Sequence, residues 1–152
     1  MITPLQKQAL VAHNIVMTNL SLFHLLLPIV AFSTEYTKEI MLFSLVVSVI
    51  CSMYIAKGAS NKSHDSFVAA HWKMAWRRSR YILISYVVSA SVMGLGWLFA
   101  TSQTDPQMKK ILLTTFIPMA IVPTLLTVLI VLVLQTMTMT RAKKGLVPNN
   151  VI

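Results

Sequence analysis

Four histidines are the side chains of this sequence best suited to binding a cofactor or a metal ion. They are His13, His24, His64 and His71. His13 and His24 are eleven residues apart, which puts them within about 20° of each other on a helix. Haem held between transmembrane helices would use His13, His24 or His71, and a metal site would need His13, His64 and His71 to meet. Both remain alternatives to the expected state, which is hydrogen-bonded histidines with no cofactor and no metal.

The other chemically active side chains predict no catalytic site. The four carboxylates are Glu35, Glu39, Asp65 and Asp105, and all lie in segments that we expect to be loops. None lies within an apolar run, where an intramembrane acid would indicate proton or ion transport. The single cysteine, Cys51, lies inside an apolar run, where an inert buried thiol is expected and no intramolecular disulfide is possible. We therefore expect the protein not to be an enzyme.

The composition of the sequence indicates a membrane protein. Hydrophobic residues make up 56% of the 152 residues, charged residues only 11%, and the mean hydropathy is +0.71. A soluble domain of this size has about a quarter of its residues charged. Four apolar runs approach or exceed the ~20 residues that span a bilayer, and they cover residues 11–32, 40–56, 81–101 and 111–137. The sequence thus predicts an all-α integral membrane protein with four transmembrane helices, forming a single membrane domain over residues 1–152.

The first run, residues 11–32, also resembles a cleaved signal peptide, because Ala31-Phe32-Ser33 loosely fits a cleavage site. We expect this run to be retained as a transmembrane helix.

The distribution of basic residues predicts the orientation. Ten of the 13 Lys and Arg residues lie before the first run, in the segment 57–80 or in the tail 138–152. Because cytoplasmic loops carry the excess of Lys and Arg, both termini and the segment 57–80 are expected to be cytoplasmic. The net charge of +9 is explained by this topology and by anionic lipid headgroups, without nucleic acid.

The segment 57–80 is the most strongly charged part of the sequence. It should begin with a loop, residues 57–65, in which Gly58 ends the preceding helix, and continue as a basic amphipathic helix that joins the third span without a break. The side chains expected to contact lipid headgroups or a partner are Trp72, Lys73, Trp76, Arg77 and Arg80. His71 lies on the stripe next to that of the basic residues, and it is expected to hydrogen-bond the cytoplasmic end of another helix.

Small residues at helical spacing predict where the helices pack. Ser44, Ser48 and Ser52 repeat every fourth residue in the second run, and Ala90 and Gly94 are four apart in the third. Ridges of small side chains let helices approach closely in lipid. We expect both ridges to be helix-packing seams.

The first run contains an unusual number of polar residues. Asn14, Thr18 and Ser21 share one stripe, and His24 follows three residues later. Lipid tails offer no hydrogen-bond partners. These four side chains are therefore expected to face the interior of the bundle.

The residues 66–73, S-F-V-A-A-H-W-K, followed by Arg77 and an aromatic-led span, resemble a pattern in a family of small uncharacterised bacterial inner-membrane proteins. In that family an aromatic residue, a Ser-His or Ala-His pair, an aromatic, a basic residue and a later Arg precede a transmembrane helix, roughly as W-L-x-S-H-F-R-W-Q-x-R. The similarity covers about twelve residues, and Met74 and Ala75 replace the Trp-Gln of the pattern. It implies three or four helices in a bacterial inner membrane and no established activity.

Three functions are compatible with these observations. The first is an accessory or assembly subunit that packs against a larger membrane complex or against itself. The second is a small oligomeric transport or permeation unit, lined by the polar stripe of the first helix and the Pro118 and Pro123 region of the fourth. The third is a haem-bearing electron-transfer subunit. The lack of an acidic residue within any apolar run favours the first.

Overall fold

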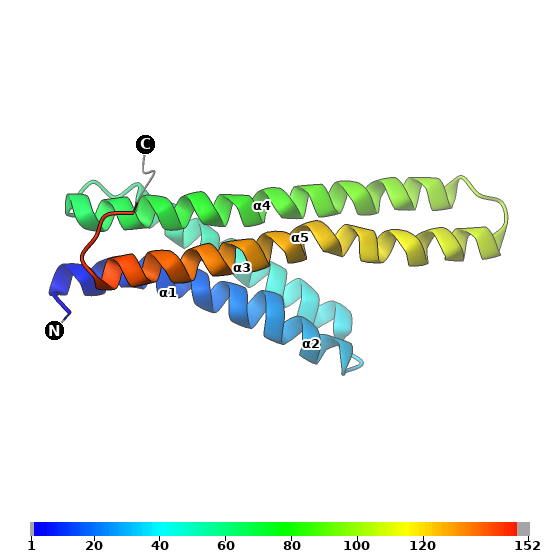
Figure 1. The fold of residues 1–152 in the computed structure, drawn as a ribbon. Coiled ribbons are helices and arrows are strands. Elements are labelled where there is room, and N and C mark those ends of the chain that lie inside the picture. Colours follow the sequence, from blue (N-terminus) through cyan, green and yellow to red (C-terminus); the bar gives the residue numbers. More distant parts are fainter. Residues whose placement is uncertain (1, 149–152) are drawn as a thin grey trace. The chain divides into compact units, whose positions relative to one another are not determined.

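The computed structural model describes residues 2–148, and within them every regular element is a helix (Figure 1). The elements are α1 (Pro4–Thr18), η1 (Asn19–Leu26), α2 (Leu27–Phe32), α3 (Thr37–Ala59), α4 (Ser66–Thr101) and α5 (Pro106–Lys143). The first three join into one helical stretch, Pro4–Phe32, in which η1 is π-helical. This stretch, α3, α4 and α5 are each long and apolar enough to cross a membrane. The structure therefore contains the four long apolar helices that the sequence predicts.

The helices extend beyond the apolar runs that predict them. Helix α3 continues through Gly58 to Ala59, so the expected helix end at Gly58 is wrong. Helix α5 continues to Lys143, so the first part of the expected tail 138–152 is helical, and residues 149–152 of that tail lie outside the described residues. Hydropathy marks only the part of a helix that suits lipid, whereas backbone hydrogen bonds continue until a cap or a turn ends them. The prediction that residues 66–80 and the third span form one continuous helix is confirmed by α4.

Contacts within the chain divide it into two compact units. The first comprises Met1–Arg80 and Ile130–Ile152, and the second comprises Tyr81–Leu129. Both boundaries fall inside helices, so α4 and α5 each contribute one end to each unit.

Capping side chains determine where the helices begin. Thr3 and Gln6 form a capping box at α1: the Thr3 N–H donates to Gln6 Oε1 (2.7 Å) and the Gln6 N–H to Thr3 Oγ1 (3.3 Å). At the start of α4 the Asp65 carboxylate accepts from the Phe67 N–H (2.8 Å), and Asp105 caps α5 in the same way. Two of the four carboxylates thus have a structural role.

Helix α5 ends in a glycine-dependent turn. Gly145 has a φ of +71°, and its N–H and that of Leu146 bond back to the carbonyls of Ala142 (3.1 Å) and Arg141 (3.0 Å). The Gln6 side chain also donates to a carbonyl in the last turn of α5 (3.1 Å). The end of α5 is therefore held against the start of α1.

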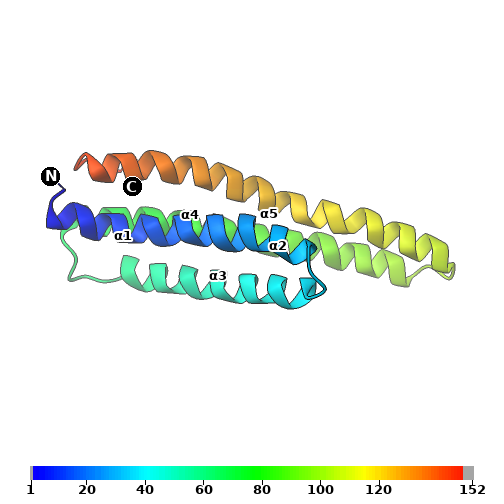
Figure 2. The same cartoon turned by 90° about the horizontal axis from the view of Figure 1, so that it is seen from below.

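In the first unit α3 packs beside the stretch Pro4–Phe32 (Figures 1 and 2). Ser44, Ser48 and Ser52 are all buried on α3. The Ser52 hydroxyl donates to the Ser48 carbonyl (2.9 Å), which satisfies it without a partner on another helix. The burial of all three serines agrees with the predicted packing seam.

The second unit pairs the later part of α4 with the earlier part of α5. Gly96 lies so close to Phe116 that a Cβ atom at this position would overlap the Phe116 side chain. On the same side of α4, Ser89 shares a hydroxyl hydrogen bond of 2.8 Å with Thr124. These close contacts define the packing face of the second unit.

Ala90 and Gly94 are exposed, so the prediction that they form a packing seam within this chain is wrong. A Cβ atom at Gly94 would meet no other atom within 4 Å. The face that packs contains Ser89 and Gly96, which are seven residues apart and share a stripe. Ala90 is rotated by about 100° from Ser89, which places it outside this contact.

Candidate functional site

Two buried histidines from different helices face each other in the first unit. His13 projects from α1 and His71 from the second turn of α4, and both side chains have an exposed fraction of 0%. His13 Nε2 lies 2.8 Å from His71 Nδ1, and the two rings are nearly perpendicular (89°). Phe67 packs edge-on against the His71 ring, with 4.7 Å between the centroids. His71 is thus buried in the first unit and hydrogen-bonds a side chain of another helix.

The histidine pair continues into α5 through Gln135. The Gln135 Nε2 atom lies 2.7 Å from His13 Nδ1 and 3.2 Å from the His13 carbonyl oxygen. Gln135 Oε1 accepts a 2.8 Å hydrogen bond from Nη1 of Arg78 on α4. Arg78 Nη2 donates to Thr138 Oγ1 at 2.6 Å. We call the five side chains the His13 network: His13, His71, Arg78, Gln135 and Thr138.

Arg78 determines the direction of the hydrogen bonds in the His13 network. A guanidinium only donates, so Gln135 presents its oxygen to Arg78 and its amide nitrogen to His13. His13 Nδ1 is therefore an acceptor, and the His13 proton is on Nε2, which donates to His71 Nδ1. The His71 proton is then on Nε2, where it donates to the carbonyl of Leu146 (3.2 Å). Both imidazoles are consequently neutral and in the same tautomer.

The charge of Arg78 is buried without a carboxylate partner. Its exposed fraction is 8%, and no Asp or Glu in residues 2–148 bonds to it. Its two acceptors are the neutral oxygens of Gln135 and Thr138. A buried charge is costly unless hydrogen bonds compensate its lost hydration. These two oxygens are therefore essential to the stability of the buried guanidinium.

The geometry of the histidine pair does not suit haem. Two axial histidines lie on opposite sides of the iron, with each metal–nitrogen bond about 2 Å long. The facing nitrogens of His13 and His71 are only 2.8 Å apart and share a hydrogen bond. His24 is engaged separately, because its Nδ1 atom bonds to the Asn19 carbonyl (3.0 Å).

The three histidines considered for a metal site are not grouped as ligands. His64 stacks on Trp72 with 5.7 Å between the ring centroids, while His13 and His71 bond to each other. Within residues 2–148 no group of three or more His, Cys, Asp and Glu side chains is placed to hold a metal ion. The contacts that the structure shows within the His13 network are hydrogen bonds, and its two imidazoles are groups that can bind protons.

The polar stripe of the first helix faces outward, so the expectation that it faces the bundle interior is wrong for Asn14, Thr18 and Ser21. The contacts of His13 explain why these three side chains face outward. Its bonds to His71 and Gln135 turn its own face of α1 inward, and Asn14 follows about 100° further around the helix. Of the four residues predicted to be interior, only His24 is largely covered.

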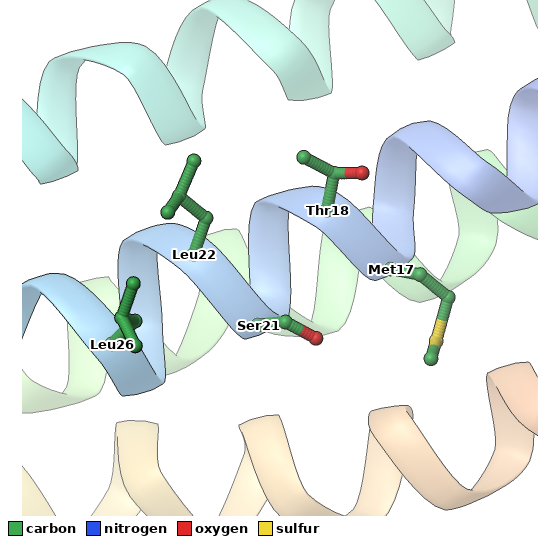
Figure 3. A pocket seen from close by; sticks show the side chains of 5 residues that line it. All are labelled: Met17, Thr18, Ser21, Leu22 and Leu26. Atoms are coloured by element: carbon green, nitrogen blue, oxygen red, sulfur yellow. The ribbon is translucent and has the colours of Figure 1, made fainter.

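Thr18 and Ser21 line a groove along α1 and η1 (Figure 3). Its volume is about 440 Å³, and its other lining residues are Met17, Leu22 and Leu26. The groove thus combines apolar surface with two hydroxyl groups on one helix.

The π-helical section η1 places polar groups inside the first unit. Asn19 is buried, with an exposed fraction of 1%, and neither atom of its amide group has a hydrogen-bond partner in the described structure. His24 Nε2 lies 3.5 Å from the Ser48 hydroxyl on α3. Single π turns inside α-helices often occur at functional sites, and here the section contains the buried Asn19.

Trp72 is buried within the chain, so the prediction that it contacts lipid or a partner is wrong. Its indole packs against Gly58, where the ring leaves no space for a Cβ atom. Tyr54 (6.0 Å between centroids) and the stacked His64 cover it further. Trp76 is half-buried. The sequence pattern places an indole beside basic residues, but it does not reveal the space that a glycine on another helix provides.

Lys73, Arg77 and Arg80 are exposed on α4. Their spacing of four and three residues places them on one stripe, as predicted. Arg78, which belongs to the same basic run, instead points inward to Gln135.

The sequence contains a periodic pattern that identifies the buried residues of α4 and α5. The predictions above do not use this pattern. Buried positions of α4 include Val68, His71, Ala75 and Arg78, and those of α5 include Val131, Gln135, Thr138 and Ala142. Both sets alternate spacings of three and four residues, the pattern of a helix-packing seam. Arg78 and Gln135 occupy polar positions in these seams, which marks them as a buried pair.

Comparison with protein-family models, with curated proteins and with solved structures finds no match to this chain.

Proposed function

We propose that this protein is a non-catalytic, multi-pass protein of a bacterial inner membrane that acts as an accessory or assembly subunit. The observation that carries the proposal is the exposed polar stripe Asn14, Thr18 and Ser21 on an apolar helix. The partner that we propose for this stripe is a transmembrane helix of another membrane-protein subunit, with hydrogen-bonding side chains at matching depth.

The stripe differs from two other exposed hydroxyls on an apolar helix. Thr114 and Thr115 are also exposed on an apolar helix, but their hydroxyls donate to their own backbone (2.8 and 2.9 Å). The side chains of Asn14, Thr18 and Ser21 make no hydrogen bond within residues 2–148. Lipid tails offer none, so a second helix would satisfy these groups.

The groove supports a helix as the occupant. Close packing against Met17 and Leu22, combined with hydrogen bonds to Thr18 and Ser21, is the combination by which transmembrane helices associate. At ~0.6 kcal/mol for each interhelical hydrogen bond, the three groups of the stripe would contribute about 2 kcal/mol.

A photo-crosslinking residue in place of Leu22 tests this proposal in intact membranes. We expect a protein adduct whose yield falls about twentyfold when Asn14→Leu, Thr18→Val and Ser21→Ala are combined, because about 2 kcal/mol of association is lost. The matched control is Thr114→Val with Thr115→Val, which removes exposed hydroxyls that are already satisfied and should leave the yield unchanged. An equal yield from the triple variant, or adducts with lipid alone, would contradict the proposal.

We further propose that both termini and residues 60–65 lie in the cytoplasm, where Lys73, Arg77 and Arg80 contact anionic headgroups. The charge distribution supports this orientation, since ten of 13 Lys and Arg residues lie on one side. In a Cys51→Ser background, an impermeant thiol reagent added from outside should label Gln103→Cys and not Ser63→Cys. Labelling of Ser63→Cys alone would reverse the orientation and place the three cations at the opposite leaflet.

A further inference from the structure

We propose that the His13–His71 pair is an acid-sensitive clasp that holds α1 against α4 and opens when either imidazole is protonated. The proposal rests on the geometry of the His13 network and is independent of any partner at the polar stripe.

The His13 network has no acceptor available for an additional proton. A proton on His71 Nδ1 would point at the Nε2–H of His13, across a separation of 2.8 Å. A proton on His13 Nδ1 would point at the amide NH₂ of Gln135, across 2.7 Å. Either proton therefore replaces a hydrogen bond with two donors that face each other.

Rearrangement of the amide does not relieve this conflict. If Gln135 turned its oxygen toward His13, its NH₂ group would face Arg78 Nη1, which can only donate. It would also lose the bond from its amide nitrogen to the His13 carbonyl (3.2 Å). Since Arg78 keeps its charge, protonation of the pair must break a contact that joins α1 to α4 or α5.

The hydrogen bond between His71 and the Leu146 carbonyl determines which contact of His71 breaks. A protonated His71 can still donate from Nε2 to the carbonyl of Leu146. The Leu146 segment is thus expected to remain with α4, and the contact that opens is the one to His13 on α1. Repulsion between a protonated His13 on α1 and the Arg78 guanidinium on α4, which are bridged by Gln135, acts in the same direction.

The pH dependence of the clasp also depends on which titratable groups surround the pair. The remaining groups bonded to the pair are the uncharged Gln135 side chain and the carbonyls of His13 and Leu146. The titratable side chains elsewhere on the packed elements are mainly lysines, arginines and carboxylates, residue types that do not titrate in this range in solution. The charged residues on α1, on α3, at the start of α4 and at the end of α5, including the residues that flank these ends, are Lys7, Lys38, Glu39, Lys57, Asp65, Lys73, Arg77, Arg78, Arg80, Arg141, Lys143 and Lys144. His64, stacked on Trp72, is the nearby histidine outside the network, which makes it a control.

Spin labels on the two helices measure the opening. In a Cys51→Ser background, labels at Val11→Cys on α1 and Lys73→Cys on α4 occupy exposed positions of the first unit. In nanodiscs we expect one narrow distance distribution at pH 8, where both imidazoles are neutral, and a longer, broader one at pH 5, where protonation of an imidazole opens the pair. His64→Gln should keep this response, whereas His13→Gln combined with His71→Gln should abolish it.

Two results would overturn the clasp. One is an unchanged distance in the parent protein between pH 8 and pH 5, and the other is a pH response that persists in the double variant. If the double variant is already open at pH 8, ¹⁵N spectra of the histidines in the parent protein still test the protonation states on which the clasp depends. Two of the four rings must be neutral and protonated on Nε2 at pH 8, and an imidazolium or an Nδ1–H tautomer in the pair would reject the proposal.

Discussion

Replacing Gln135 with Leu is expected to lower the free energy of unfolding by about 3 kcal/mol or more. The apolar side chain would leave the buried Arg78 guanidinium with one acceptor, Thr138, in place of two. It would also leave His13 Nδ1 buried without its donor. Breaking a buried charged interaction by removing one partner typically costs about 3–5 kcal/mol, because the remaining charge is uncompensated. The unfolding equilibrium in mixed micelles, measured against the parent, gives this difference.

Two further variants distinguish the loss of the hydrogen bonds from a general effect of mutating α5. Thr136→Leu changes the adjacent residue, which is exposed and bonds only to its own backbone (3.0 Å), and should cost little. Arg78→Met combined with Gln135→Leu removes both partners and should recover much of the lost stability, since a buried pair replaced by apolar side chains is often near neutral. If Gln135→Leu stays within about 1 kcal/mol of the parent, Arg78 is not dependent on Gln135.

The second large effect is expected from Gly96→Ala, which should destabilise the protein by about 1–3 kcal/mol. Its methyl group would overlap the Cβ and Cγ atoms of Phe116, and Cβ cannot move without shifting the α5 backbone. Gly94→Ala is the matched control on the same helix, where a methyl group meets nothing within 4 Å. That change should be neutral or stabilising by up to about 1 kcal/mol, because Ala favours the helix.

Thermal unfolding of the two alanine variants side by side measures the contrast. Equal stability of Gly96→Ala and Gly94→Ala would mean that α4 and α5 do not pack through Gly96 in the second unit. A loss of thermal stability in Gly94→Ala alone would indicate that the helices pack through the Ala90–Gly94 face, as the spacing of small residues predicts.

Three of the wrong predictions share one cause. The stripe of Asn14, Thr18 and Ser21, the ridge of Ala90 and Gly94, and the position of Trp72 are each predicted from one helix considered alone. A period of 3.6 residues shows which side chains share a face, but it does not show which face another helix covers. Gly58 under Trp72 and Phe116 against Gly96 are contacts with a second helix that no single run contains.

The sequence alone determined that four long apolar helices form and that residues 66–80 continue directly into the third of them. These features depend on local properties: hydropathy over about 20 residues, capping by side chains such as Asp65, and the absence of a helix breaker after Arg80. The seam of Ser44, Ser48 and Ser52 is also predictable, because a full ridge of small side chains has few other uses in an apolar helix.

Only the tertiary structure decided which polar groups are buried together. His13, His71 and Gln135 lie on three different helices. His13 is 58 residues from His71 in the sequence and 122 residues from Gln135, and it bonds to both. Arg78 lies in a run of four cations within residues 73–80, and nothing local distinguishes it from Arg77 until a facing helix offers an oxygen. Hydrogen bonds are short-ranged and directional, so the tautomers of both histidines, and the acid sensitivity inferred from them, follow from the way α1, α4 and α5 are packed.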